Sequence, residues 1–354
     1  RSSDLAQLIQ AMYNIVDSYF VGQFSSDGLT ALSIVYPVQL IVTAIAVGTG
    51  VGVNTLMSRY DGQGNHHLAD RTAGTGTVLA LISWLIFAVL SGLLMRPFAA
   101  ISTESSSVAD LAVTYGTIVC VGSPGVFLES TWSKVHQARG NMRLPMLAQI
   151  AGAAANIVLD PIFIFGLGPM PELGICGAAW ATGIGQTASL LFYLILNHVK
   201  PLNVEISLRE MRPSKEICGG MYSVGIAATL NMALTSLLLT ALNAILAPFS
   251  QVYILVLGVY YKLQALLYQG ASGVVQGMRP LIGYNYGAGE QERVKKIFRA
   301  AFMIVGIIMT AGTLLGELVP DFLMGLFTQT PSTVEIGRTA LRTSNIKTSR
   351  FTRL

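Results

Sequence analysis

Long apolar stretches recur along almost the whole chain, and they leave few folds open to it. A helix needs about 20 mostly apolar residues to cross a bilayer. Nine stretches meet this requirement, and none of the hydrophilic stretches between them is long enough to form a soluble domain. The predicted spans are Leu5–Gln23, Leu29–Ser58, Ala73–Met95, Val108–Glu129, Met146–Phe165, Ile175–Asn197, Met221–Pro248, Val252–Ile282 and Val294–Leu318. The sequence therefore predicts an all-α, polytopic transmembrane helical bundle that resides in the lipid bilayer.

The charge content excludes a soluble protein of this size. Asp, Glu, Lys and Arg make up 11% of the 354 residues, whereas a soluble domain carries roughly 25%. The three cysteines, Cys120, Cys176 and Cys218, have no metal-binding or disulfide spacing. We expect them to be free thiols.

Basic residues predict the orientation in the membrane, because Lys and Arg accumulate in cytoplasmic loops. The odd-numbered connections hold only Arg96. The even-numbered connections hold thirteen basic residues: Arg59, Arg71, Lys134, Arg139, Arg143, Lys200, Arg209, Arg212, Lys215, Arg293, Lys295, Lys296 and Arg299. This asymmetry predicts a multi-pass protein of the cytoplasmic membrane with its N-terminus in the cytoplasm.

Four glycines indicate an internal repeat. Gly48, Gly52, Gly62 and Gly64 recur 225 residues later as Gly273, Gly277, Gly287 and Gly289, in each case at the end of a long apolar helix and in the loop that follows. Such repeats are typical of secondary transporters. An even number of helices separates the copies, so the repeats are expected to be parallel.

The repeat predicts two pseudo-symmetric six-helix lobes, the second of them truncated. Residues 1–199 are expected to form the N-terminal lobe, with the start of its first helix missing. Residues 200–215 are expected to form a cytoplasmic linker, and residues 216–354 an incomplete C-terminal lobe that ends in a tenth helix beginning near Val334.

Ionisable residues at membrane depth are costly, so each is a candidate for function. Asp17 lies on the first predicted span, and Asn156 and Asp160 lie on the fifth. The i,i+4 spacing of Asn156 and Asp160 places them on one helical face, and Pro161 can free backbone carbonyls beside them. Together they predict a site for a proton or a sodium ion. The alternative is that Asp17 and Asp160 only cap or hydrogen-bond near a helix end.

Three stretches of the chain resemble the multidrug and toxic compound extrusion (MATE) family: Tyr13–Gly22, Asn156–Asp160 with Phe163–Gly168, and Gly283–Gly289. The resemblance extends from about Leu8 to Arg342. It implies two lobes that alternate their access to the two sides of the membrane, driven by an inward proton or sodium gradient. It also implies that Asp17, Asn156, Asp160 and Thr182 form the ion-coupling cluster. Because Met221–Pro248 contains no acid, the DinF-like branch fits better than the NorM-like branch.

Three other residues are candidates for a substrate cavity: Lys262, Tyr36 and Met232. A lysine there could pair with a carboxylate or compete with a cationic drug, but it could equally extend to the membrane interface. Tyr36 and Met232 could equally pack against lipid or other helices. Glu129 and His136, beside Lys134, are expected to form a solvated end of the fourth span.

No nucleotide-binding loop, metalloprotease motif or hydrolase motif occurs in the sequence. We therefore expect no enzyme activity, no cofactor other than the coupling H+ or Na+, no ATP and no nucleic-acid partner. The predicted function is a secondary active antiporter that exports organic cations. One alternative is a flippase for lipid-linked saccharides, which would need several cations in its cavity to hold a pyrophosphate. The other is a truncated product that does not transport.

Overall fold

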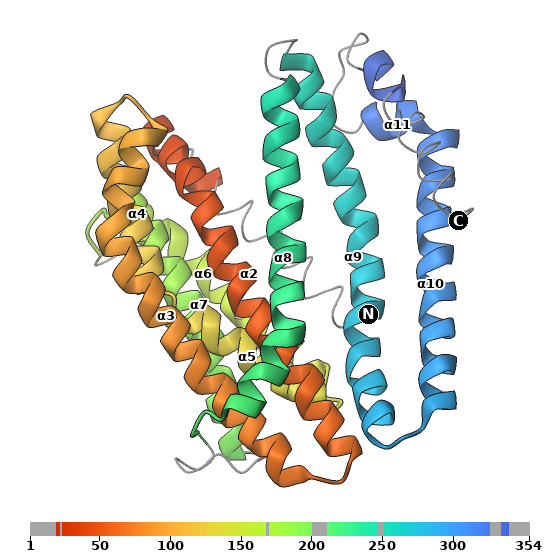
Figure 1. The fold of residues 1–354 in the computed structure, drawn as a ribbon. Helices are drawn as coiled ribbons and strands as arrows, with labels where there is room; N and C mark the ends of the chain where they lie inside the picture. The colour runs from red at the N-terminus through yellow and green to blue at the C-terminus, as the bar shows by residue number, and fades with distance from the viewer. Residues whose placement is uncertain are drawn as a thin grey trace. The chain divides into compact units, whose positions relative to one another are not determined.

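The computed structural model describes residues 19–21, 23–167, 170–199, 211–246, 251–325 and 334–339, and every regular element in these ranges is helical (Figure 1). The helices that follow the first segment are α2 (Ser26–Gly62), α3 (His66–Ser102), α4 (Ser106–Val121), α5 (Pro124–Ala138), α6 (Arg143–Phe165), α7 (Ile175–Val199), α8 (Lys215–Leu246), α9 (Gln251–Gly287), α10 (Gln291–Leu318) and α11 (Pro320–Gly325). The all-α prediction is confirmed.

Within the described residues, six helices are long and apolar enough to cross a membrane: α2, α3, α6, α7, α8 and α10. A seventh span results if α4 and α5 are counted as one bent span. These helices coincide with predicted spans, which confirms a polytopic membrane protein. Most of the first predicted span, Leu5–Gln23, lies outside the described residues, as does most of the predicted linker. The predicted lobe boundaries at residues 199 and 216 stay a prediction.

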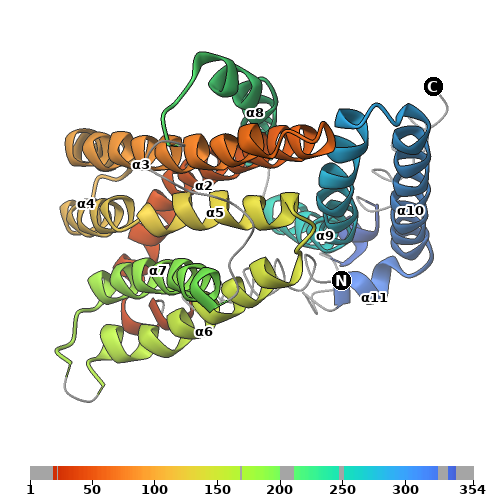
Figure 2. The same cartoon turned by 90° about the horizontal axis from the view of Figure 1, so that it is seen from below.

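The chain divides into two compact units. The first comprises Arg1–Leu234 and Arg279–Val294, and the second comprises Thr235–Met278 and Lys295–Leu354. In the first unit, α5 packs against α2, α3, α6 and α7, and the view from below shows it between α3 and α7 (Figure 2). Three clusters of buried apolar side chains form the core of this unit.

A break at Gly122 and Ser123 separates α4 from α5, which are bent by 41° relative to each other. Pro124 begins α5, and the residue before a proline is disfavoured in helical conformation. Side chains satisfy the freed carbonyls, because Trp84 Nε1 of α3 donates to Val121 O at 3.0 Å and Ser123 Oγ donates to Cys120 O at 2.7 Å. A broken helix is tolerated at membrane depth when such donors replace its lost hydrogen bonds.

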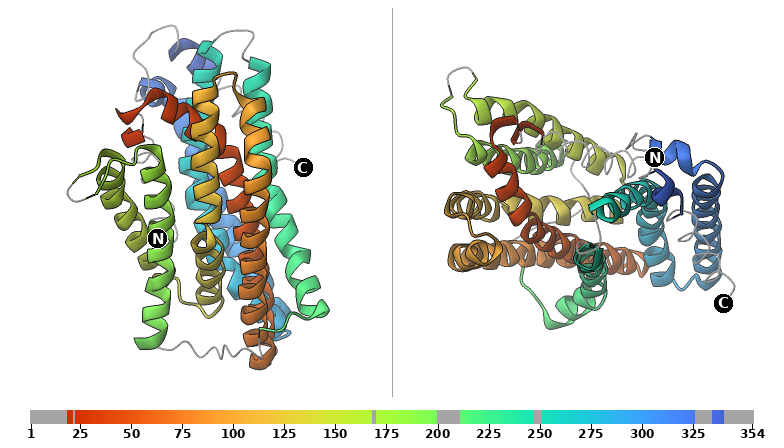
Figure 3. Two further views of the ribbon diagram at one scale, coloured as in Figure 1. Left: turned by 90° about the vertical axis from the view of Figure 1, so that its left-hand side faces the viewer. Right: turned by 90° about the horizontal axis from the view of Figure 1, so that it is seen from above.

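In the second unit, α9 and α10 run side by side (Figures 1 and 3). A Cβ atom at Gly270 of α9 would touch Ile308 of α10 at 3.8 Å. Large apolar side chains are exposed on α10, among them Phe302 and Ile307, at 70% and 69%. Exposed apolar surface of this kind suits contact with lipid.

Candidate ion-coupling site

Helix α6 carries a buried amide and a buried carboxylate one turn apart. Asn156 is 2% exposed, and Asp160 is not exposed at all. Asn156 Nδ2 donates a hydrogen bond to Asp160 Oδ1 at 3.2 Å. Within the described residues, the amide oxygen of Asn156 is buried without a hydrogen-bond partner. Buried polar atoms are normally satisfied, so such an exception requires an explanation.

Pro161 directly follows the carboxylate, and α6 continues through it to Phe165. Because proline has no N–H, the carbonyl of Ile157 loses its usual donor four residues later. That carbonyl lies one residue after Asn156 and three before Asp160. Oxygen atoms of three chemical kinds are therefore available on this part of α6: carboxylate, amide and backbone carbonyl.

Helix α7 packs antiparallel to α6 in a register set by glycines. A Cβ atom at Gly185 would lie 3.0 Å from Asn156 Cβ. A Cβ atom at Gly177 would overlap the backbone of Phe163, and one at Gly152 would overlap Ser189 Oγ. Ser189 Oγ in turn donates to Ala148 O at 2.9 Å. Small residues allow this close approach of membrane helices.

The same register places Thr182 and Asp160 at the same level of the two helices. Thr182 lies one turn before Gly185 on α7, and Asp160 lies one turn after Asn156 on α6. Thr182 is 8% exposed. The structure thus brings Asn156 and Asp160 into contact and buries Thr182 on the adjacent helix, while Asp17 lies outside the described residues. Among the described residues, no group of three His, Cys, Asp or Glu side chains forms a metal site.

For the predicted cavity residues, the structure gives the helix on which each one lies and, for two of them, the exposure of the side chain. Tyr36 lies on α2 and is 50% exposed, and Met232 lies on α8 and is 37% exposed. Lys262 lies within α9, but its side chain falls outside what the structure describes. Their roles stay a prediction.

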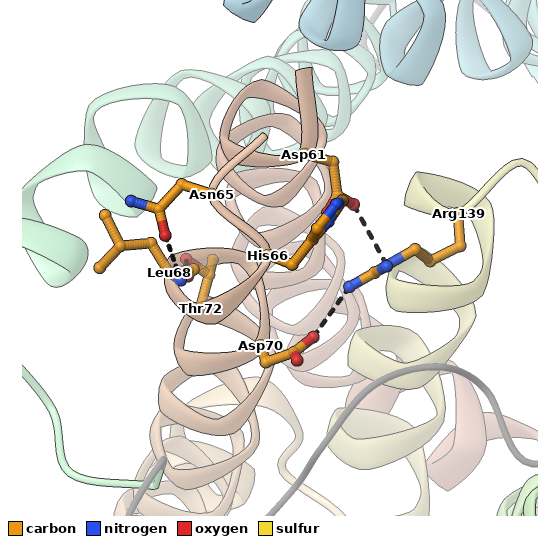
Figure 4. A network of polar contacts seen from close by, with 7 residues as sticks. All are labelled: Asp61, Asn65, His66, Leu68, Asp70, Thr72 and Arg139. Atoms are coloured by element: carbon orange, nitrogen blue, oxygen red, sulfur yellow. Dashed lines mark hydrogen bonds and ion pairs between the residues drawn. The ribbon is translucent and has the colours of Figure 1, made fainter. Parts of the chain in front are cut away.

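A network of ion pairs joins α2, α3 and α5 at one end of the first unit, which we call the basic end (Figure 4). Arg139 lies between two carboxylates. Its Nε is 3.1 Å from Asp61 Oδ2, and its terminal nitrogen is 2.8 Å from Asp70 Oδ1. His66 Nδ1 lies 2.9 Å from the other oxygen of Asp61. The two carboxylates were not among the predicted functional residues, although their positions at helix ends beside an arginine-containing loop are visible in the sequence.

The expectation of a solvated helix end at Glu129 and His136 is wrong. His136 is 1% exposed, Lys134 is 8% exposed, and the Oε1 atom of Glu129 is buried. Helix α7 covers this part of α5, and Tyr193 stacks on the ring of His136. The position of a residue near a helix end does not reveal which neighbouring helix covers it.

Comparison with known families agrees with this architecture. The family model MatE matches residues 3–162 and 227–346, and its two segments begin at nearly the same spacing as the repeated glycines. Multidrug export protein MepA of Staphylococcus aureus (strain N315) is 26% identical over 340 residues, which cover 96% of this chain and 74% of that protein. An FAD transporter of Shewanella oneidensis is 25% identical over 326 residues, covering 91% of this chain and 72% of that protein.

Solved structures share the fold. A MOP superfamily transporter from Pyrococcus furiosus superposes with a TM-score of 0.85 at 25% identity, over 96% of this chain and 76% of that one. An outward-facing multidrug resistance MATE family transporter superposes with a TM-score of 0.86 at 24% identity, over 98% of this chain and 76% of that one. These proteins are transporters and not enzymes. Because the family model matches most of the sequence, the chain belongs to the MatE family of multidrug efflux transporters.

Proposed function

We propose that this chain is a secondary antiporter that exports small organic cations across the cytoplasmic membrane in exchange for H+ or Na+. The observation that supports this most strongly is the buried pair of Asn156 and Asp160. An ionised carboxylate without solvent is costly unless a cation or proton compensates it. Binding of the coupling ion therefore changes the charge inside the first unit, and this change can bias the protein between two conformations.

The proposed coupling site consists of Asp160, Asn156 and Thr182, and Asp17 completes it from the N-terminal segment. A carboxylate alone is sufficient to carry a proton. The amide and hydroxyl oxygens beside it are the type of ligand that a hard cation such as Na+ takes. The site chemistry thus accommodates either ion, and the gradient supplies the energy in place of ATP.

The basic end is proposed to face the cytoplasm. Arg59, Arg71, Arg139 and Arg143 lie at or next to the helix ends gathered there. The positive-inside rule assigns such an end to the cytoplasm, which also places the N-terminus on that side.

Organic cations are the proposed substrates because the relative in Staphylococcus aureus is a multidrug export protein. Lys262, Tyr36 and Met232 are the proposed cavity residues. A second candidate substrate class is a dinucleotide anion, which the FAD transporter among the relatives supports. A pyrophosphate would require several cationic side chains around it.

The test is transport by the purified chain in proteoliposomes that contain a fluorescent cationic dye or FAD. Dye movement that follows an imposed pH or sodium step, and fails with both gradients collapsed, is the expected result. Movement of FAD but not of the dye would favour the second candidate. Movement that is independent of either gradient would refute the antiport mechanism.

A further inference from the structure

A second group of buried and half-buried polar side chains lies around α5 and its neighbouring helices, apart from the Asn156–Asp160 pair. Its members are Glu129, Lys134 and His136 of α5, with Tyr193 of α7. Tyr193 and His136 are each 1% exposed. Three ionisable groups and a phenol in such a place are expensive to bury, and their retention suggests a function.

Glu129 lies against two neighbours from the adjacent helices. Its carboxyl group faces the hydroxyl of Tyr193 on α7 and the side-chain amide of Gln149 on α6. Even so, the Oε1 atom of Glu129 and the hydroxyl oxygen of Tyr193 are both buried without a completed hydrogen bond to the described residues. Hydrogen-bonding capacity is thus left open on one oxygen of the carboxyl group and on the hydroxyl that faces it.

His136 is a third group whose polar atoms are unsatisfied. Its ring stacks on Tyr193 with centroids 5.0 Å apart, and neither ring nitrogen has a hydrogen-bond partner among the described residues. A neutral imidazole of this kind has one nitrogen that can donate and one that can accept a hydrogen bond. Because it lies two residues from the end of α5 at Ala138, it is on the basic-end side of Glu129.

Charged and polar groups from the surrounding helices lie next to this site. Lys134 interacts electrostatically with Glu129 and with Arg279 of α9, which belongs to the first unit. Lys134 Nζ donates to Gln137 Oε1 at 2.9 Å, and Asn54 Nδ2 of α2 donates to the Lys134 carbonyl at 3.0 Å. A nearby ammonium group lets Glu129 exist as a carboxylate as well as a neutral acid.

The site lies along the same seam as the proposed coupling site. Gln149 is seven residues before Asn156, so it lies on the same face of α6 about 10 Å closer to the basic end. On α7, Ser189 lies between Tyr193 and Gly185, in the register already described. Polar side chains of α6 and α7, among them Asn156, Ser189 and Gln149, therefore lie between the level of Asp160 and the part of α5 that carries Glu129.

We propose that Glu129, which faces Tyr193, is a second proton-binding site of the first unit and exchanges protons with the basic end. A proton from water on the basic-end side forms an O–H bond with the Glu129 carboxylate, and the reverse transfer returns that proton to water. This deepens the proposed function, because it gives the antiporter a proton site between the coupling pair and the cytoplasm.

Infrared difference spectroscopy of the purified protein between low and high pH tests the proposal without relying on transport. A protonated carboxyl group gives a C=O stretching band, which disappears when the group ionises. We expect Glu129→Gln to lose one such band, while Glu129→Asp restores a band and shows that the site is intact. Tyr193→Phe should shift the Glu129 band, because it removes the facing hydroxyl but keeps the ring. The matched control, Tyr115→Phe, removes an equally buried hydroxyl that accepts from Gln39, and it should leave the band unchanged.

An unchanged spectrum in Glu129→Gln would overturn the proposal, since Glu129 would then not titrate. This failure is distinct from failure of the antiport function. If Asp160→Asn kept gradient-driven efflux while the Glu129 band was present, the coupling role of Asp160 would be refuted and the proton site at Glu129 would be supported. If Asp160→Asn abolished efflux while no Glu129 band existed, only the second site would fail.

Discussion

Arg139 joins two carboxylates of different helices at the basic end of the first unit. It is paired with Asp61 and Asp70, whose side chains are 7% and 12% exposed. Removal of one partner from a buried ion pair leaves an uncompensated charge and costs about 3–5 kcal/mol. We therefore expect Arg139→Met to lower the thermal unfolding midpoint in detergent clearly.

The matched control is Arg293→Met, because Arg293 lies 4.0 Å from Glu290 and both side chains are mostly exposed. An exposed pair contributes about 1 kcal/mol or less, so this variant should unfold near the wild-type temperature. Equal losses in the two variants would show that the Arg139 network does not stabilise the bundle.

Asn156 is expected to support the ion site without carrying its charge. Asn156→Ala removes the donor to Asp160 Oδ1 but leaves the carboxylate in place. Loss of a partner that orients an ion-binding group typically weakens binding about 10- to 100-fold. The concentration of H+ or Na+ that gives half-maximal efflux should rise accordingly. An unchanged ion dependence would exclude Asn156 from the site.

At this scale, the sequence predicts the site only in part. The proximity of Asn156 to Asp160 follows from helical spacing alone. Thr182 was predicted only through the family resemblance. Its level relative to Asp160 depends on the glycine register between α6 and α7, which the spacing of residues within one helix does not reveal. The burial of His136 and of the Glu129 Oε1 atom was not predicted, because it depends on coverage by Tyr193 from a helix more than 50 residues away in sequence.

Helices α2 and α9 are in contact through equivalent positions of the two repeats. A Cβ atom at Gly62 would overlap the Tyr284 carbonyl oxygen, and one at Gly287 would overlap the Arg59 carbonyl oxygen. Arg59 and Gly62 correspond to Tyr284 and Gly287 in the 225-residue repeat, so the contact is reciprocal. The equivalent positions Ser58 and Gly283 face each other, with 2.9 Å between Ser58 Cβ and an ideal Cβ at Gly283.

This reciprocal contact predicts a cross-link. Cysteines at Ser58 and Gly283, in a background with the native cysteines replaced, should form a disulfide under mild oxidation, because a small separation of the two helices brings their Cβ atoms to the bridging distance of about 3.5–4.5 Å. Gly287→Val should reduce cross-linking strongly by keeping the backbones apart. Gly277→Val is the control on the same helix, since a Cβ atom there meets nothing within 4 Å. Equal cross-linking in both variants would contradict the glycine contact.

The helices themselves were the most predictable elements, because each span needs a long apolar run. Their bounds were less predictable. Helices α2 and α3 each comprise 37 residues, well beyond the apolar stretches, because polar residues outside the hydrocarbon continue a helix at little cost. The break at Gly122 and Ser123 within the fourth span was not predicted, because Trp84 supplies one of its compensating hydrogen bonds from another helix.

For the whole molecule, the charge asymmetry predicts which end faces the cytoplasm. With the native cysteines replaced, Gln63→Cys and Glu290→Cys should react with a membrane-impermeant maleimide only from the cytoplasmic side. Glu104→Cys, between α3 and α4 at the opposite end, should react only from outside. All three positions are exposed, so accessibility depends on the side of the membrane. The reverse labelling pattern would invert the proposed orientation.

The central claim is that ion binding at Asp160 drives export. The most direct measurement compares two activities of the same Asp160→Asn protein in proteoliposomes: dye efflux driven by an imposed pH or sodium step, and dye–dye exchange with no gradient. The amide is nearly isosteric and cannot take up the charge change, so we expect gradient-driven efflux to fall to background while exchange persists. Asp110→Asn, at an exposed acid on α4, should leave both activities intact. Wild-type gradient-driven efflux in Asp160→Asn would contradict the account.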